Sequence, residues 1–359
     1  MFKFEDLKAG LVEDFKINIE ELKGFIENKI KECDRVIIVP HINADFDAIG
    51  SALGLSLIAK KYNKPFNIIV NDPPHIIEPG VKKIINECNK EYLIEKKDKY
   101  LKTKDDNEKV LYLLTDVNKK NLICVNELLT DPDNVIVIDH HNPGYDKEHP
   151  EKSTVEVNNI FIDNIKSSAS EIITELLKEM EIEIPSNVAN YLYSGIYLDT
   201  FKLTKNYQDN TMTMAALLLS SGATAEKVNE YFREDIESDR KVQALVSNIK
   251  ITNYMIAIVK AMEDEEYTRE ELAKAADYAL KYGVDASFAI GRIEDDYVSV
   301  SGRSNAKINM DAVMKSIGGG GSPTSGAARR QNVTIEEMYN DLIDTLKPSY
   351  AKDDKNKVK

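Results

Sequence analysis

The sequence is most tightly constrained by an apolar run that ends in three chemically reactive side chains. Residues 134–138 read Asn-Val-Ile-Val-Ile, and Asp-His-His follows at 139–141. Apolar, β-branched residues without polar alternation predict a strand that is buried on both faces. Similar runs at 35–40 and 110–115 are also followed by histidine or aspartate. Because open parallel sheets bind ligands beyond the carboxyl ends of their strands, we expect these side chains to meet at one edge.

Strands and helices alternate through the first two thirds of the chain. A strand is predicted at 66–70, and helical periodicity is present at 51–61, 167–180 and 187–197. This alternation predicts an α/β fold with a mostly parallel sheet that is covered on both faces. The charge-rich stretch 95–109 is most simply a solvated loop, and a short helix is expected near 122–129.

The chain is long for a single hydrophobic core, and the pattern of predicted elements changes after about residue 248. Short strands, one long helix and a run of glycines predict a second, smaller α+β domain. The expected organisation is an N-terminal helical segment (1–32), an α/β domain (33–231), a linking helix (232–248), the second domain (249–347) and a disordered tail (348–359).

Composition excludes several classes of protein. The net charge of −14 argues against a groove that binds nucleic acid by neutralising phosphates, so no duplex partner is expected. Cys33, Cys88 and Cys124 are too widely spaced for a zinc site or a disulfide framework, which favours a reducing compartment. No run approaches the roughly 18 apolar residues of a membrane-spanning helix. We therefore expect a soluble, cytoplasmic protein that makes no membrane contact.

The side chains that follow the predicted strands and helices form a set suited to hard divalent cations. They are His41, Asp45, Asp47, Asp116, Asp139, His140, His141 and Asp199. Carboxylates with imidazoles and no thiolate favour manganese or magnesium over structural zinc. The four aspartates outside 139–141 would repel one another if bare, and two divalent cations would balance their charge. Such a pair would activate water against a phosphate ester.

Each of these residues has a simpler explanation when it is taken alone. A single aspartate after a strand commonly caps a turn or a helix, and a lone histidine is commonly structural. Three of the five histidines, however, lie beside aspartates at the ends of predicted strands, and the whole set is spread over four segments of the chain. That coincidence favours a metal centre over unrelated structural roles.

Four motifs of the first domain resemble the DHH phosphoesterase superfamily. They are His-x-x-x-Asp-x-Asp-x-x-Gly-Ser at 41–51, Asp116, Asp-His-His at 139–141, and Gly-Ile-Tyr-Leu-Asp-Thr at 195–200. The resemblance covers roughly residues 30 to 345 and implies an α/β DHH domain followed by a DHH-associated C-terminal domain.

The second domain carries its own part of this resemblance. Ser-Gly-Arg-Ser lies at 301–304, and the glycines 318–321 are followed by two alanines at 327–328. On composition alone the four glycines would be a flexible linker. Within the superfamily, Ala-Ser-Phe at 286–288 and Ile-Asn at 308–309 are similar to GdpP-type cyclic-di-AMP phosphodiesterases.

The resemblance implies two manganese ions, with magnesium or cobalt as alternatives, and a role for each matched residue. One ion would be held by His41, Asp45 and Asp116, and the other by Asp47, Asp116, His140 and Asp199, with Asp116 shared. Asp139 would orient His140. His141 would stabilise charge at the scissile phosphate or protonate the leaving oxygen. Arg303, Ser304 and the N–H groups of Gly320 and Gly321 would bind another part of the substrate.

Two positions depart from the family pattern. Ser322 follows the glycines where the family has a histidine that contacts substrate phosphate, and a serine hydroxyl carries no charge. Asn210 stands where a basic residue is expected. These departures predict weaker binding or a shifted substrate, because the ligand set for the metals is complete.

The resemblance implies a manganese-dependent phosphodiesterase that opens cyclic-di-AMP to pApA and can continue to AMP. An alternative is an oligoribonuclease that also removes the 3′-phosphate from adenosine bisphosphate. A third is a nucleotide-binding sensor whose turnover Ser322 has impaired. Longer GdpP-type proteins add membrane helices and sensory domains, so this chain would be a free-standing catalytic unit or a piece of a larger protein. A homodimer is also implied.

Overall fold

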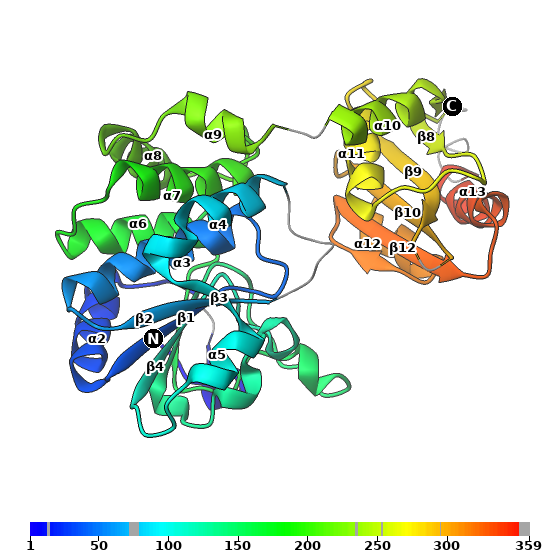
Figure 1. Cartoon of the computed structure of the whole chain (residues 1–359). Coiled ribbons are helices and arrows are strands. Elements are labelled where there is room, and N and C mark those ends of the chain that lie inside the picture. Colours follow the sequence, from blue (N-terminus) through cyan, green and yellow to red (C-terminus); the bar gives the residue numbers. More distant parts are fainter. Residues whose placement is uncertain (13–14, 72–78, 234–235, 253, 295, 352–359) are drawn as a thin grey trace. The chain divides into compact units, whose positions relative to one another are not determined.

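The computed structural model describes residues 1–12, 15–71, 79–233, 236–252, 254–294 and 296–351. The chain divides into two units, unit 1 (Met1–Arg233) and unit 2 (Glu234–Lys359), and each has its own hydrophobic core. Figure 1 shows the helices and strands of both units.

Unit 1 is built on a six-stranded parallel sheet. Its strands are β1 (Arg35–Val39), β2 (Phe66–Val70), β3 (Ile94–Lys96), β4 (Val110–Thr115), β5 (Val135–Asp139) and β6 (Asn159–Ile162). They lie in the order β3-β2-β1-β4-β5-β6, and every neighbouring pair is parallel. The order reverses at β1 and β4, the kind of switch point at which open α/β sheets place their ligand sites.

Two cores cover the two faces of this sheet. Val36 and Ile38 of β1 point into one core, whereas Ile37 and Val39 point into the other. The helices of unit 1 are α1 (Phe4–Lys8), α2 (Ile19–Glu32), α3 (Phe46–Lys61), α4 (Pro79–Tyr92), α5 (Lys97–Thr103), α6 (Ala169–Glu179), α7 (Ser186–Asp199), α8 (Asp209–Ser220) and α9 (Ala225–Tyr231). Residues of α2, α3, α6 and α7 line the first core, which confirms the predicted α/β class.

Unit 2 has a mixed sheet in the order β11-β12-β10-β9-β8-β7. The strands are β7 (Lys250–Ile251), β8 (Ile256–Lys260), β9 (Ala286–Ile293), β10 (Tyr297–Ser304), β11 (Gly320–Gly321) and β12 (Ser325–Gln331). β8 and β9 are parallel, and the other pairs are antiparallel. The helices are α10 (Ile236–Ser247), α11 (Arg269–Leu280), α12 (Met310–Ser316) and α13 (Ile335–Ala351), which completes an α+β unit.

Several predicted elements differ from the structure. The stretch 95–109 was predicted as a loop, but it contains α5, which lies at the surface of unit 1 and is held by the buried side chain of Tyr100. The helix expected near 122–129 is replaced by 3-10 turns at Lys120–Leu122 and Asn126–Leu128. Strand β6 was not predicted, because its apolar run is only three residues long.

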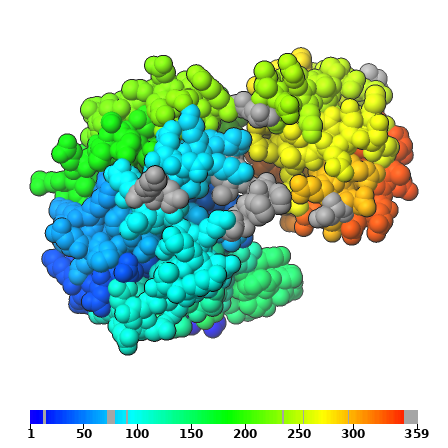
Figure 2. Space-filling model, viewed as in Figure 1, coloured from blue at the N-terminus to red at the C-terminus, as the bar shows by residue number. Residues whose placement is uncertain are grey.

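Two further segments bear on the predicted organisation. Helix α10, expected to link the domains, contributes Val242, Leu245 and Val246 to the core of unit 2. Helix α13 continues to Ala351, past residue 348, where the sequence had suggested the start of a disordered tail. The rest of that tail, 352–359, lies outside the described residues. Figure 2 shows the surface of each unit on the face in view.

Candidate metal centre

The parallel sheet brings four segments of unit 1 to the carboxyl ends of β1, β4 and β5. His41 follows β1, Asp116 follows β4, and Asp139 is the last residue of β5. Asp199 is the last residue of α7, not a residue just past its end as the sequence had suggested. The eight predicted site residues of unit 1 therefore meet at one edge of the sheet.

Three side chains form the first half of this cluster. His41 Nε2 lies 3.4 Å from Asp116 Oδ2 and 3.8 Å from Asp45 Oδ2. Ligand atoms about 2.1 Å from one ion lie about 3 to 4 Å apart in octahedral geometry. The separations of His41, Asp45 and Asp116 match that spacing, and one divalent cation would fit among them.

The second half shares Asp116 with the first. His140 Nε2 lies 3.4 Å from Asp116 Oδ1, 3.6 Å from Asp199 Oδ2 and 3.8 Å from Asp47 Oδ2. The two oxygens of Asp116 thus face different histidines, Oδ2 toward His41 and Oδ1 toward His140. This carboxylate is placed where it could contact both of two cations.

Asp45 and Asp47 also have structural roles, because each caps a helix. Asp45 is the N-cap of α3, where its Oδ1 accepts hydrogen bonds from the N–H groups of Asp47 and Ala48. Asp47 is fully buried, and its two oxygens accept from the N–H groups of Ala169 and Ser170, each at 2.7 Å. These N–H groups begin α6 and favour an anion there. The capping explanation therefore holds together with the metal explanation.

Close packing of α7 against α3 positions Asp199. A Cβ atom on Gly195 would lie 2.7 Å from Asp47 Oδ1, and one on Gly50 would lie 2.5 Å from the carbonyl oxygen of Tyr191. Only glycine at these positions allows the two helices to approach so closely. The glycines therefore determine how near Asp199 comes to the carboxylate of Asp47.

Asp116 has a strained backbone. Its φ of 57° is in the left-handed region, which β-carbon sterics disfavour for every residue except glycine. Its N–H donates to the carbonyl oxygen of Ile138 on the neighbouring strand. Backbone strain of this kind persists where the surrounding structure fixes it, and it is common at functional sites.

The electrostatics of the cluster indicate missing positive charge. Burial and the neighbouring carboxylate of Asp116 raise the pKa of Asp47 to about 7, and burial with Asp47 and Asp116 also raises the pKa of Asp199. Burial lowers the pKa of His41, but the carboxylates of Asp116 and Asp45 outweigh it and raise that pKa to about 10. The protein alone would thus hold protons where divalent cations would supply charge.

Unsatisfied polar atoms test whether the site fits a metal. Among the described residues, three buried side-chain atoms have no hydrogen-bond partner, namely Thr115 Oγ1, Asp116 Oδ1 and His140 Nε2. Asp116 Oδ1 and His140 Nε2 lie in the second half of the cluster and are 3.4 Å apart. Buried polar atoms without partners cost free energy, and a shared cation would satisfy both. The donor set therefore fits a pair of hard divalent cations.

Asp139 does not contact the ring that the sequence had suggested. It was expected to orient His140, but its Oδ1 lies 2.9 Å from His141 Nδ1 and reaches His140 only through the main-chain N–H. The turn after β5 directs the ring of His140 toward Asp116 and that of His141 back toward Asp139. Contacts with Asp116 and Asp139 raise the pKa of His141 to about 11, and its side chain is 59% exposed.

Sequence reasoning missed the residues that support Asp139. Asn118 donates to Asp139 Oδ2 at 2.5 Å and to the carbonyl oxygen of His141, and it accepts from Thr154. The position of Asn118, two residues after Asp116, was the one feature of the sequence that could have indicated its place in the site. Asn210, the unexpected neutral residue, donates to Glu171 and Glu175, so it is part of the packing between α6 and α8.

In unit 2 the predicted substrate-binding side chains already have protein partners. Arg303 donates from Nε to Asp277 Oδ1 at 2.9 Å and from Nη1 to the carbonyl oxygen of Gly302. Ser304 is buried, and its hydroxyl accepts from the N–H of Ile308. Arg303 is thus partly neutralised by a carboxylate that lies 26 residues away in sequence.

The glycine run is part of the sheet and is no flexible linker. Gly320 and Gly321 form β11 opposite Ala327 and Gly326 of β12. The N–H of Gly321 donates to Asp311 Oδ1 at 3.0 Å, so it must exchange this partner before it can bind a phosphate. Ser322 closes the hairpin, because its hydroxyl accepts from the N–H of Ser325 at 3.1 Å.

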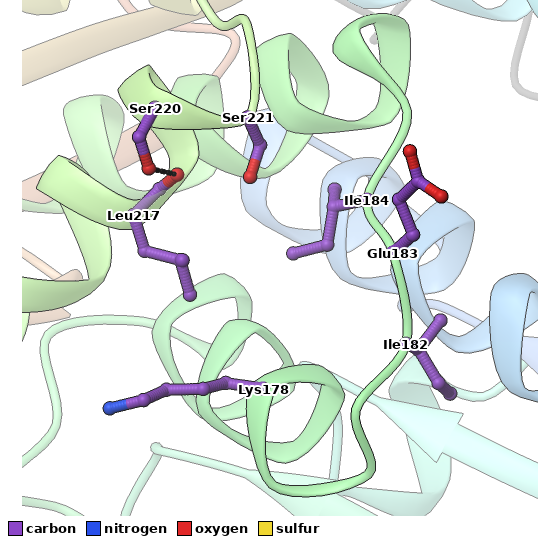
Figure 3. A pocket seen from close by; sticks show the side chains of 7 residues that line it. All are labelled: Lys178, Ile182, Glu183, Ile184, Leu217, Ser220 and Ser221. Atoms are coloured by element: carbon purple, nitrogen blue, oxygen red, sulfur yellow. Dashed lines mark hydrogen bonds between the residues drawn. The ribbon is translucent and has the colours of Figure 1, made fainter.

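A surface pocket of unit 1 is separate from this cluster. Figure 3 shows it between the end of α6, the segment 182–184 and the end of α8, where Lys178, Ile184 and Leu217 line it. None of the predicted site residues lies there. In the part of the chain that the structure describes, no helix has the length and apolar character needed to cross a bilayer.

Comparison with known proteins supports the same organisation. Residues 35–196 match the DHH family, N-terminal domain, and residues 251–351 match the DHHA1 domain. Cyclic-di-AMP phosphodiesterase PdeA of Listeria monocytogenes is 31% identical over 92% of this chain and 50% of its own length. The chain therefore spans about half the length of that relative.

Two other similarities cover nearly the whole of the matched protein. The bifunctional oligoribonuclease and PAP phosphatase NrnA of Mycoplasma genitalium is 25% identical over 88% of this chain and 95% of its own length. The crystal structure of an exopolyphosphatase-related protein from Bacteroides fragilis has the same fold, with a TM-score of 0.74, 22% identity and coverage of 92% of this chain and 96% of that one. With a DHH domain followed by a DHHA1 domain, this chain belongs to the DHH family.

Proposed function

We propose that the protein is a phosphodiesterase that hydrolyses cyclic-di-AMP to pApA with the help of two divalent cations, manganese first among them. The observation that carries this proposal is the double role of Asp116, whose two carboxylate oxygens face His41 and His140 inside one buried cluster. The name of the Listeria relative, at 31% identity, supports the choice of substrate.

The cations would be held by His41, Asp45 and Asp116 on one side and by Asp47, His140 and Asp199 on the other, where Asp116 joins through its contact with His140. When bound there, they supply Lewis-acid activation of water and compensate the charge of a phosphate ester. The protein keeps these ligands in place before any cation enters. Asp47 is fixed by the first turn of α6, and Asp116 by its strained main chain.

His141 is proposed as the proton donor to the leaving oxygen. Asp139 Oδ1 contacts its Nδ1, so the proton available for transfer is on Nε2. Asn118 fixes Asp139 from the opposite side, which orients the imidazole. An exposed ring beside a buried ligand cluster is within reach of a substrate that binds from solvent.

The direct test is incubation of the purified chain with cyclic-di-AMP and manganese, with products separated by chromatography. We expect pApA to appear with manganese, less of it with magnesium, and none after chelation. Asp116→Asn serves as the negative control. No product from the wild-type protein in any divalent metal would refute the proposal.

A second function, hydrolysis of short oligoribonucleotides and of 3′-phosphoadenosine 5′-phosphate, is supported by the NrnA relative that this chain spans almost completely. The two proposals use the same ligands and differ in substrate. Turnover of pApA and of 3′-phosphoadenosine 5′-phosphate faster than that of cyclic-di-AMP would favour the second.

A further inference from the structure

The loop that follows Asp199, one of the proposed metal ligands, carries exposed aromatic and basic side chains. Residues 200–208 connect α7 to α8 and read Thr-Phe-Lys-Leu-Thr-Lys-Asn-Tyr-Gln. Phe201 is 58% exposed and Tyr207 is 46% exposed. Lys202 and Lys205 are also exposed, and the loop contains no acidic residue. The loop thus presents two lysines and two aromatic rings between Asp199 and Asp209, in a protein of net charge −14.

The backbone of this loop is strained in a defined way. Phe201, Lys202 and Leu203 have φ values of 49°, 64° and 58°, so three consecutive residues other than glycine adopt the left-handed conformation. Asn206 does the same at 54°. L-residues visit this region singly and rarely in succession. Strain of this kind points to a function that requires the loop to have one shape.

Hydrogen bonds that Thr200 accepts hold the loop in that shape. The carbonyl oxygen of Thr200 accepts from the N–H groups of Thr204 and Lys205, each at 2.9 Å, and its hydroxyl accepts from the N–H of Leu203. Thr200 itself is fully buried. Leu203 packs against the main core of unit 1, which leaves Phe201 directed away from it. The exposed ring is therefore presented by a fixed turn.

The main chain of both aromatic residues runs close to Asp199. Phe201 is two residues after it, and a chain of two residues spans at most about 7 Å. At the other end of the loop, the side-chain amide of Asn206 donates to the carbonyl oxygen of Asp199 at 3.4 Å, which brings Tyr207 back to the same place. The loop thus flanks one of the ligands proposed to hold the cations.

The chemistry of the loop suits a nucleotide better than a simple phosphate ester. Lys205 Nζ lies 5.4 Å from the centre of the Phe201 ring, so a cation is already placed against the ring. Exposed aromatic rings with nearby lysines bind nucleic-acid components by stacking on the base and attracting the phosphate. A protein that acted on a small phosphate ester without a base would gain nothing from an exposed phenylalanine here.

We propose that Phe201, assisted by Lys205, forms a base-stacking subsite next to the metal centre and that this subsite selects nucleotide substrates. The subsite deepens the proposed function and rests on it for the position of the reacting phosphate. The binding of the base, however, can be measured without hydrolysis.

The chain has no tryptophan, so Phe201→Trp introduces the only indole. Its fluorescence, excited at 295 nm where adenine does not absorb, is measured during titration with AMP in the presence of magnesium. We expect saturable quenching by AMP at concentrations at least about tenfold lower than those at which ribose 5-phosphate acts, because base stacking on an aromatic side chain is worth about a tenfold gain in affinity or more.

Leu219→Trp is the matched control. Leu219 belongs to the same unit and is 44% exposed. It lies ten residues after Asp209, the first residue of α8, which places it about 15 Å along the helix from the loop. Its quenching by AMP should be weak and linear. Equal action of AMP and ribose 5-phosphate on Phe201→Trp, or no saturable quenching, would overturn the proposal. Because the fluorescence reports binding and not turnover, this result is independent of whether cyclic-di-AMP is the substrate.

Steady-state kinetics give the second readout. Phe201→Ala should raise the KM for cyclic-di-AMP about tenfold with kcat changed less than about twofold, and Phe201→Tyr should restore the KM. Loss of kcat in both variants would show that the ring is needed only for folding of the loop, and would refute the stacking role. Absence of any turnover in the wild-type protein would refute the proposed function and leave the fluorescence result standing.

Discussion

The candidate functional residues of the two units differ in whether their polar groups already have partners in the protein. In unit 1 the proposed ligands are buried or half-buried, and Asp116 Oδ1 and His140 Nε2 have no hydrogen-bond partner. In unit 2, Arg303 is paired with Asp277, and the N–H of Gly321 is bonded to Asp311. Unmet polar capacity indicates a site that is complete except for its ligand, whereas satisfied groups must exchange partners before they bind anything. We therefore expect unit 1 to determine the chemistry and unit 2 to adjust the affinity.

The largest effect is expected at Asp116. Asp116→Asn keeps the size of the side chain but removes the charge shared by the two halves of the cluster. Activity should fall about 1,000-fold or more, because several kcal/mol of transition-state stabilisation come from the metal site. The exposed Asp98 of α5 is a matched control, and Asp98→Asn should leave the rate unchanged. Retention of activity by Asp116→Asn would contradict the expectation that unit 1 determines the chemistry.

His141 should come next. His141→Gln removes the proposed proton donor while the ligands of both cations remain, so kcat should fall about 100- to 10,000-fold, the range for general acid catalysis. Metal affinity, measured by calorimetry, should stay within about threefold of the wild-type value. A large loss of affinity would instead make His141 a ligand.

The metal-free protein should become less stable as pH rises. The folded-state pKa of His41 is raised to about 10 and that of His141 to about 11, so the stability they contribute is fully present below about pH 6.5 and is lost as pH rises through these values. The raised pKa of Asp199 acts in the same direction. Manganese at about 100 times its Kd should raise Tm by about 5 to 10 °C near pH 8, as followed by scanning calorimetry.

Proton release provides a check on this explanation. If cations replace protons in the cluster, binding of manganese near pH 7 should release protons, and the apparent binding enthalpy should differ between buffers of different ionisation enthalpy. Equal enthalpies in both buffers would mean that the imidazoles are neutral before the metal binds.

The smallest effect is expected in unit 2. Ser322→His would place a charged donor where Ser322 now closes the β11–β12 hairpin. We expect the KM for cyclic-di-AMP to fall about three- to tenfold with kcat unchanged, the size of one additional charge-assisted hydrogen bond. Ser316→His, on the exposed end of α12, is the control. A gain of 100-fold or more in kcat would show that Ser322 had impaired the chemistry itself.

The strands of unit 1 could be predicted because burial on both faces leaves a clear sequence pattern. The bounds of β2 and β4 match the predicted runs, since both runs are mostly apolar and a polar residue, Asn71 or Asp116, follows each of them. Helix α5 was missed because only Tyr100 within its charged sequence is buried. The glycine run looked like a linker by composition, but side chains at Gly319 and Gly321 would collide with the backbone of β12, which no local pattern reveals.

For the candidate site, the sequence could predict which residues of unit 1 come together. It could not predict which of their atoms are in contact. Parallel strands bring His41, Asp116 and Asp139 together whatever their side-chain angles. The contact between Asp139 and His141 depends on the turn after β5, and the pairing of Arg303 with Asp277 depends on how α11 lies on its sheet. Such contacts come from tertiary structure and leave no trace in residue spacing.

The helix cap at Asp47 has a consequence for the evolution of such proteins. Its carboxylate secures the first turn of α6 whether or not any ion is present. A descendant that abandoned hydrolysis would still be selected to keep Asp47 for the integrity of its fold, while Asp199, which makes no comparable cap, would be free to drift. Among relatives that have lost hydrolytic activity, substitution of Asp199 at the end of α7 would therefore indicate the loss better than substitution of Asp47.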